Sequence, residues 1–197
     1  MMPRAHLAAL LLGPILLLGI GVWGRAPAVP SSPPVYAEHP PLGHTGGFGE
    51  PTCHACHFGG EVNGGEGTLT VEGLPDSVRS GQSYTLAVTQ TAQMKRSGFM
   101  LSVRRPDGSQ AGGLVPLDTA RVAVGSPDSS TVQYAYHTLE GTILSEPNRA
   151  TWSVQWTAPT RVGDSVRVHA AANAANDYAA AAGDDIYTTT TRAVVVE

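Results

Sequence analysis

Apolar and polar residues alternate with a period of two in several separate runs after Gly67. The clearest runs cover residues 84–88, 99–103 and 152–156, and shorter ones cover 69–71 and 166–168. Successive side chains of a strand point to opposite faces, so each run predicts a strand with one buried face. Trp152 and Trp156 share a face of their strand, and we expect both in the core.

Turn-forming residues separate these runs at short intervals. The turn signals are Pro75-Asp76, Ser80-Gly81, Pro106-Asp107-Gly108, Gly125-Ser126-Pro127, Glu146-Pro147-Asn148 and Val162-Gly163-Asp164. Short strands joined by such turns are typical of an antiparallel sandwich. The sequence therefore predicts an all-β, Ig-like antiparallel β-sandwich over residues 67–197. Residues 170–182 contain nine alanines, and there we expect a short helical turn or an ordered loop.

The N-terminal segment differs in composition from the rest of the chain. Arg4 precedes an uncharged run over residues 7–22, and Ala26-Pro27-Ala28 follows it. This pattern predicts a signal peptide or an N-terminal membrane anchor over residues 1–28. Residues 29–50 are rich in proline and glycine and read as a linker. Both interpretations place the folded part outside the cytoplasm, with contact to a membrane possible through the apolar segment.

Composition and charge exclude several classes of function. The 197 residues include 42% hydrophobic side chains and carry a formal net charge of −4. That apolar content is too high for a disordered chain, and a single lysine without a basic patch argues against nucleic-acid binding. No catalytic triad, paired carboxylates or phosphate loop stands out, so side-chain catalysis is not indicated.

The motif that carries chemistry is Cys53-His54-Ala55-Cys56-His57. C-x-x-C-H is the attachment signature of c-type haem. Two thiols at this spacing can add to the two vinyl groups of one porphyrin, and His57 can then bind the iron. Residues 51–66 are therefore predicted to be the haem-attachment segment, with one haem c held by Cys53 and Cys56. A C-x-x-C redox pair and a zinc site remain as alternatives.

The sixth ligand of such an iron is sought among histidines and methionines. His137, which follows Tyr134 and Tyr136, is our first candidate. The alternatives are Met94, expected in an exposed turn; His169, expected on the face opposite Val166 and Val168; and His39 and His44, expected on the linker. Met100 is a further candidate, although methionine in a strand more often fills a core.

From about Gly49 to the C-terminus the chain resembles the bacterial choice-of-anchor V domains, a Reeler-like β-sandwich group. The matching segments are residues 49–57, 97–101, 136–142, 156–159, 168–176 and 183–188. The resemblance implies an exported sandwich that often carries C-x-x-C-H near its start. It also places His137-Thr138 at a matching position, whereas at His169 relatives tend to have an aromatic residue.

These features predict an exported monohaem c-type cytochrome that transfers electrons. We expect its acidic charge to favour a basic patch on a redox partner protein, such as a membrane respiratory or photosynthetic complex. The alternative is a Reeler-like binding or structural module of an envelope assembly, whose haem is a sensor or an accessory.

A weaker hypothesis is a calcium site among Asp177, Asp184 and Asp185, near Asn173 and Asn176. The simpler interpretation of these residues is a turn whose side chains cap nearby backbone N–H groups.

Overall fold

The computed structural model describes residues 39–178 and 181–197, so the predicted signal or anchor segment and residues 29–38 of the linker lie outside the described part. Ten strands and two 3-10 turns follow one another in the order η1 (Cys53–Ala55), β1 (Thr68–Glu72), β2 (Ser77–Arg79), β3 (Ser83–Thr91), β4 (Arg96–Arg104), β5 (Gly113–Pro116), β6 (Val122–Gly125), β7 (Tyr134–His137), η2 (Glu140–Thr142), β8 (Arg149–Thr157), β9 (Ser165–Ala175) and β10 (Asp185–Val196). No helix in this part of the chain is long and apolar enough to cross a membrane.

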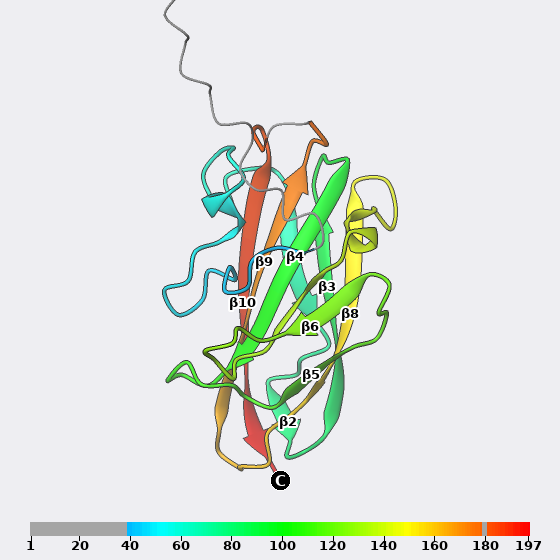
Figure 1. Ribbon diagram of the computed structural model, residues 1–197. Helices are drawn as coiled ribbons and strands as arrows, with labels where there is room; N and C mark the ends of the chain where they lie inside the picture. Colours follow the sequence, from blue (N-terminus) through cyan, green and yellow to red (C-terminus); the bar gives the residue numbers. More distant parts are fainter. Residues whose placement is uncertain (1–38, 179–180) are drawn as a thin grey trace, which may run out of the picture. The chain divides into compact units, whose positions relative to one another are not determined.

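The strands form two sheets, which confirms the predicted β-sandwich (Figure 1). One sheet has the order β1-β3-β8-β5, and the other has the order β2-β10-β9-β4-β7-β6. All neighbours pair antiparallel except β2 and β10, which are parallel. We call the side of the six-stranded sheet that faces away from the other sheet its outer face.

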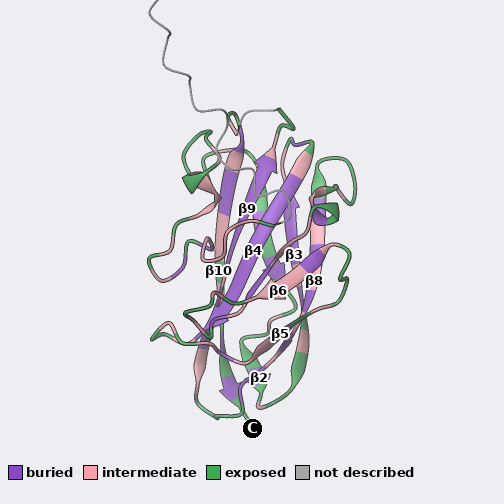
Figure 2. Ribbon diagram, in the orientation of Figure 1, coloured by how far each residue is buried: buried purple, intermediate pink, exposed green. Residues whose placement is uncertain are grey.

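The core lies between the sheets, and Figure 2 shows β4 and β9 buried along most of their length. Trp152 and Trp156 are both buried in it, as the alternation predicted. The Phe99 ring of β4 stacks on the Trp152 ring of β8 with centroids 4.5 Å apart. Phe99 therefore points inward, and its neighbours Gly98 and Met100 face outward.

The prediction of a helical turn at residues 170–182 is wrong for its first half. Residues 170–175 belong to β9, in the middle of the six-stranded sheet. Ala172 faces Phe99 on β4 and Tyr187 on β10, both large core residues. Small inward side chains on β9 leave room for these rings, so packing outweighs the helical preference of alanine. The described residues beyond 175 form the loop that leads to β10.

The prediction that Met94 is exposed is also wrong. Met94 is only 4% exposed and belongs to the main core cluster. Its backbone N–H points to Asn148 Oδ1 at 3.4 Å, so the loop before β8 covers the turn between β3 and β4. The neighbours of Met94 in the sequence are charged and polar, so the local pattern predicted exposure, whereas the methionine fills the end of the core.

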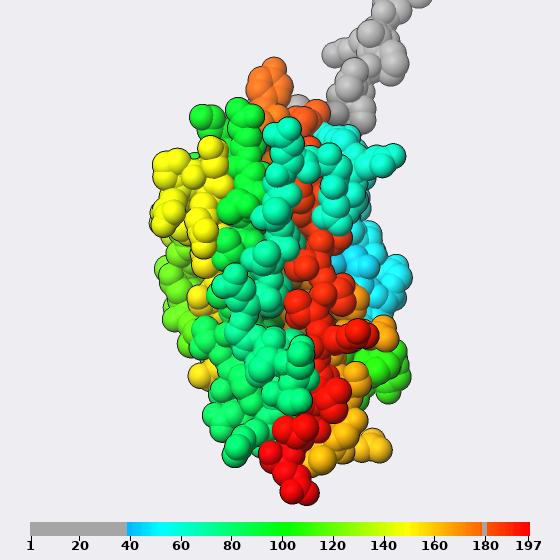
Figure 3. Space-filling view, turned by 180° about the vertical axis from the view of Figure 1, so that it is seen from behind, coloured from blue at the N-terminus to red at the C-terminus, as the bar shows by residue number. Residues whose placement is uncertain are grey.

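Residues 39–66, which we call the N-terminal strap, run across the outer face of the six-stranded sheet. Figure 1 shows the strap, in blue and cyan, crossing in front of β10, β9 and β4. Figure 3, seen from behind, shows β1 and β3 covering the other side, with β10 along their edge and the strap beyond it. The strap thus places the C-x-x-C-H motif against the sheet.

Candidate functional site

The C-x-x-C-H motif forms a tight turn. The Thr52 hydroxyl caps η1 by accepting the backbone N–H of His54 at 3.1 Å. The backbone N–H groups of Cys56 and His57 both donate to the Cys53 carbonyl, at 3.2 and 3.0 Å. Cys53 and His57 are therefore one turn apart, with Cys56 directly before the histidine.

Both cysteines are free thiols, and their surroundings differ. Cys56 is exposed, whereas Cys53 is partly buried. Burial, with a smaller contribution from the nearby Cys56, raises the pKa of the Cys53 thiol to about 12. Cys53 is thus protonated at neutral pH, unlike the low-pKa thiolate that a reactive redox pair requires.

His57 is held by a buried carboxylate from the other end of the chain. Its Nδ1 lies 2.7 Å from Asp184 Oδ2, and the Asp184 side chain is only 4% exposed. Asn173 Nδ2 lies 2.9 Å from the same His57 nitrogen and 3.2 Å from Asp184 Oδ2. An ionised carboxylate only accepts hydrogen bonds, so the proton belongs on Nδ1 and the lone pair on Nε2. The Nε2 atom makes no hydrogen bond with any residue that the structure describes.

Backbone contacts bring His57 to Asp184. Phe58 bridges Ala182, its N–H donates to the Ala181 carbonyl at 2.6 Å, and its own carbonyl accepts Gly183 N–H at 2.6 Å. A Cβ atom at Gly59 would collide with the Asp184 carbonyl. The absence of a side chain at residue 59 therefore allows the motif to dock on the loop before β10.

Asp184 is ionised in this arrangement. Burial by itself raises the pKa of the carboxyl, but the hydrogen bonds from His57, the Asn176 backbone and Asn173 outweigh it. The net pKa lies below its ordinary value. Asp184 is engaged with His57, and Asp177 lies 3.7 Å from Arg96, so these two carboxylates do not form a common calcium site.

His137 lies on the outer face beside Gly98. Its Nδ1 is 3.0 Å from the N–H of Phe99 and 3.1 Å from the carbonyl of the same residue. A Cβ at Gly98 would collide with the imidazole ring, so this glycine makes the space that the ring occupies. Burial lowers the pKa of His137, and the charges of His57 and His39 lower it further, so the ring is neutral at pH 7.

The sheet register relates His57 to His137. Gly98 on β4 is the direct partner of Asn173 on β9. His137 packs over the first of these residues, and His57 contacts the second. Adjacent strands are about 4.8 Å apart, so two histidines separated by 80 positions share one small patch of the outer face.

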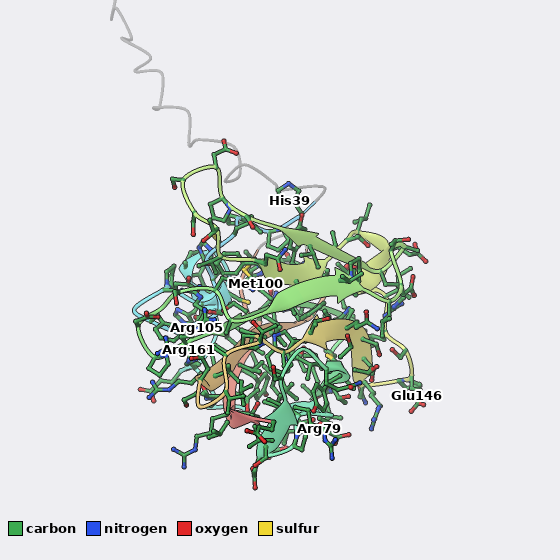
Figure 4. The ribbon with its side chains drawn as sticks, turned by 90° about the horizontal axis from the view of Figure 1, so that it is seen from below. His39, Arg79, Met100, Arg105, Glu146 and Arg161 are labelled. Carbon is green, nitrogen blue, oxygen red and sulfur yellow. The ribbon has the colours of Figure 1, made fainter. Side chains whose placement is uncertain are left out.

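Three more of the candidate ligands lie on the same face, His39 and His44 on the strap and Met100 on β4. The His39 ring lies 5.5 Å from the Tyr136 ring, measured between centroids. His44 donates its backbone N–H to the Met100 sulfur at 3.3 Å, and Met100 is buried beneath the strap. Figure 4 shows His39 and Met100 on the strap side of the sandwich and Arg79 on the opposite side.

His169 lies on the outer face, as its alternation with Val168 predicted, but the strap covers it. A Cβ at Gly47 would collide with its ring, and the Phe48 ring packs edge-on at 5.0 Å between centroids. Its Nδ1 is 3.1 Å from the Thr190 hydroxyl. His169 thus supports the strap, while Met94 lies in the core and away from this face.

A buried ion pair holds the strap in place. Glu50 accepts hydrogen bonds from Arg104, Tyr134 and Thr45. The Arg104 guanidinium lies between the rings of Phe48 and Tyr134, 5.2 Å from each centroid. We call these five residues the Glu50 clasp. Burial raises the pKa of Glu50, but the hydrogen bonds from Tyr134, Arg104 and Thr45 outweigh it, and the net pKa is lowered.

The lowered pKa values predict acid-sensitive stability. Glu50 and Asp184 titrate below their ordinary values of 4.5 and 3.8, so the unfolded chain takes up these protons first as the pH falls. Their contribution to stability is therefore complete above pH 5 and is lost as the pH falls through the folded values. Urea unfolding between pH 7 and pH 3 should show this loss. Glu50→Gln should flatten the profile; an unchanged slope in that variant would contradict the assignment.

The described residues offer no ready-made metal cluster. Among residues 39–178 and 181–197, no three His, Cys, Asp or Glu side chains are placed to hold a metal ion together. What the strap presents is instead a pair of free thiols beside one imidazole with a free Nε2.

Asp184 and Asn173 are the residues whose role sequence reasoning missed. In the sequence they suggest only a weak calcium site or a turn whose side chains cap nearby backbone N–H groups. They lie 127 and 116 positions from His57, and no local pattern relates them to the motif.

Comparison with known proteins gives similarity in fold only. No family model and no curated protein matches the chain. Among solved structures, the Reelin-N domain of F-spondin is 22% identical with a TM-score of 0.47, over 73% of this chain and 95% of that one. The human F-spondin reeler domain is 22% identical with a TM-score of 0.44, over 66% and 89%. A cohesin module of a Clostridium perfringens family 33 glycoside hydrolase is 9% identical with a TM-score of 0.41, over 66% and 96%. Such distant similarity assigns no function.

Proposed function

We propose that this domain carries one haem c on its N-terminal strap and passes single electrons between redox partners outside the cytoplasm. Cys53 and Cys56 would form the two thioethers, and His57 and His137 would be the ligands of the iron. The observation that carries the proposal is the shared patch on the outer face, where His57 and His137 meet around Gly98 and Asn173.

The residues of the patch fit a haem. The His57 Nδ1 proton goes to Asp184, and with the His137 Nδ1 proton donated to the Phe99 carbonyl each Nε2 would be left to bind iron. The lowered pKa of His137 keeps that ring neutral, as a ligand must be. Gly98 adds no side chain between the two rings. Cys56 is open to solvent, and Cys53 lies one turn from His57.

The bound haem would supply a one-electron iron couple, and the chain would supply the ligands, the charge and the rigid support around it. Two imidazole ligands favour a lower potential than an imidazole and a thioether. The Glu50 clasp fixes the strap to a packed sheet, so the ligands need to move little when the iron changes charge. The net charge of −4 favours a basic partner surface. The apolar run at residues 7–22 favours a place outside the cytoplasm, beside a membrane redox complex.

The test is a spectrum of the full chain made in cells that mature c-type cytochromes. We expect haem that stays with the protein after acid–acetone extraction and a reduced form that does not bind carbon monoxide. His137→Ala should open the sixth position, so that carbon monoxide binds and shifts the spectrum.

Two matched variants separate His137 from the other ligand candidates on this face. The variants Met100→Leu and His39→Ala should still bind no carbon monoxide in the reduced state. If one of these two variants binds carbon monoxide and His137→Ala does not, the sixth ligand is the residue replaced in that variant. Protein without covalent haem would refute the electron-carrier function.

A binding or structural module of an envelope assembly is the second candidate. Two features favour it: the Glu50 clasp fixes the strap without any cofactor, and the Cys53 thiol is protonated and partly buried. If replacing both Cys53 and Cys56 by alanine removed the haem but left partner binding and growth unchanged, this second function would be the better account.

A further inference from the structure

Asp184 is a buried charge that the attachment of a haem does not require. A haem could be held by Cys53, Cys56 and His57 with any acceptor on the His57 Nδ1 proton. A backbone carbonyl would suffice, yet this chain buries a carboxylate there. Burying an ionised group is costly unless it is paired and hydrogen-bonded.

We infer that Asp184 is a positioning residue that orients His57 and lowers the reduction potential of the haem iron. The inference rests on the proposed haem attachment and adds a role for a residue outside the motif. Asp184 touches the ligand and not the iron, so it acts through His57.

The hydrogen bonds of Asp184 hold it in one position. Its Oδ1 accepts the Asn176 backbone N–H at 3.1 Å, and its Oδ2 accepts the Asn173 amide at 3.2 Å. The His57 proton completes the set at 2.7 Å. Two of the three donors to the carboxylate therefore come from β9 and the loop before β10, and only the His57 proton comes from the strap.

Asn173 is a second observation which indicates that the Asp184 carboxylate is positioned to bind His57. Its Oδ1 is buried and has no hydrogen-bond partner among the described residues. An unsatisfied buried acceptor lowers stability. The amide thus leaves its oxygen unsatisfied while its Nδ2 donates to the carboxylate.

The chemical consequence follows from the shared proton. A carboxylate that accepts the Nδ1 proton makes Nε2 a more basic ligand. A more basic imidazole and a nearby negative charge both favour Fe(III) over Fe(II). Reduction of the bound group would take one electron from a protein donor and would break no bond, and the chain's part would be to hold the proton between His57 and Asp184.

The experiment compares two neighbouring carboxylates in the haem-loaded full chain. Asp184→Asn keeps an oxygen for the His57 proton and removes the charge. Asp185→Asn removes a charge one residue away, on a side chain near Gly60 and Gly65 with no contact to His57. Both variants change the net charge equally, so the difference between them reports the contact with His57.

We expect Asp184→Asn to shift the Fe(III)/Fe(II) equilibrium at least tenfold toward Fe(II). For a one-electron couple this is a rise of about 59 mV in the midpoint potential. Asp185→Asn should give a clearly smaller rise. Equal potentials in the two variants, with covalent haem present in both, would overturn the inference and leave the proposed function intact. Absence of haem from the wild-type protein would instead remove the proposed function itself.

A measurement on the wild-type protein covers the case in which Asp184→Asn does not fold. The reduced protein with two imidazole ligands is low-spin and diamagnetic, so its His57 Nδ1 proton is open to NMR. We expect a strongly downfield proton that exchanges slowly with water, since the Asp184 carboxylate is buried. A proton that exchanges as fast as that of an exposed histidine would contradict the inference.

Discussion

Replacing Cys53 and Cys56 together by alanine should abolish covalent haem. Thioether bonds to these two sulfurs are the only covalent attachment that the chain offers, because it has no other cysteine. Either single variant keeps one possible thioether and should retain a weakened, spectrally altered attachment. The measurement is the haem that remains after acid–acetone extraction, per mole of protein.

The fold should survive the loss of both thiols. Neither thiol forms a disulfide or belongs to the core clusters, and the Glu50 clasp holds the strap without them. The double variant should therefore keep its β-sheet circular dichroism. Haem retained by the double variant would show that the C-x-x-C-H motif is not the attachment site. Zinc found in the wild-type protein would favour the alternative that the sequence left open.

Arg104→Ala should cause the largest loss of stability among single changes on the outer face. Arg104 is 5% exposed and is the positively charged partner of Glu50. Without it the Glu50 carboxylate is left partly buried with only the Tyr134 and Thr45 hydroxyls and the Thr45 backbone N–H as donors. Removing one partner of a buried ion pair costs about 3–5 kcal/mol. Urea unfolding at pH 7 measures the loss, and limited proteolysis should cut the strap of this variant first.

The adjacent arginine is a matched control. Arg105 pairs with Asp164 at 2.7 Å, and its side chain is 30% exposed. Figure 4 shows Arg105 next to Arg161, which lies 3.6 Å from the same carboxylate. Because the Arg105 side chain is partly exposed and Arg161 stays beside Asp164, Arg105→Ala should cost clearly less than Arg104→Ala. Similar losses in the two variants would mean that the Glu50 clasp does not anchor the strap.

The sandwich could be predicted because its strands and turns depend on residues that are close together in the sequence. Alternation over 84–88, 99–103 and 152–156 sets which side chains face inward, and the turn residues between the runs set where the chain reverses. Trp152 and Trp156 lie in the core for the same reason. The errors occurred where packing outweighed local preference. The alanines of β9 lie between large core residues of β4 and β10, and Met94 fills the end of the core although its neighbours are polar.

The motif at residues 53–57 is likewise a local signal, since its spacing alone predicts haem attachment. Its surroundings are not local. Asp184 reaches His57 because Phe58 docks on the loop before β10, and His137 reaches the same patch because Gly98 leaves a gap in β4. These contacts join positions 38 to 127 residues apart, and they depend on strand order and register.

The sequence by itself determined the strands, the turns and the haem-type motif, because each depends on residues next to one another in the chain. Only the tertiary structure decided which residues surround His57. Strand pairing places Asn173 beside Gly98, and the Glu50 clasp brings the strap onto that pair. Neither the pairing nor the clasp has a signature within any short stretch of the chain, because both arise from contacts between distant segments.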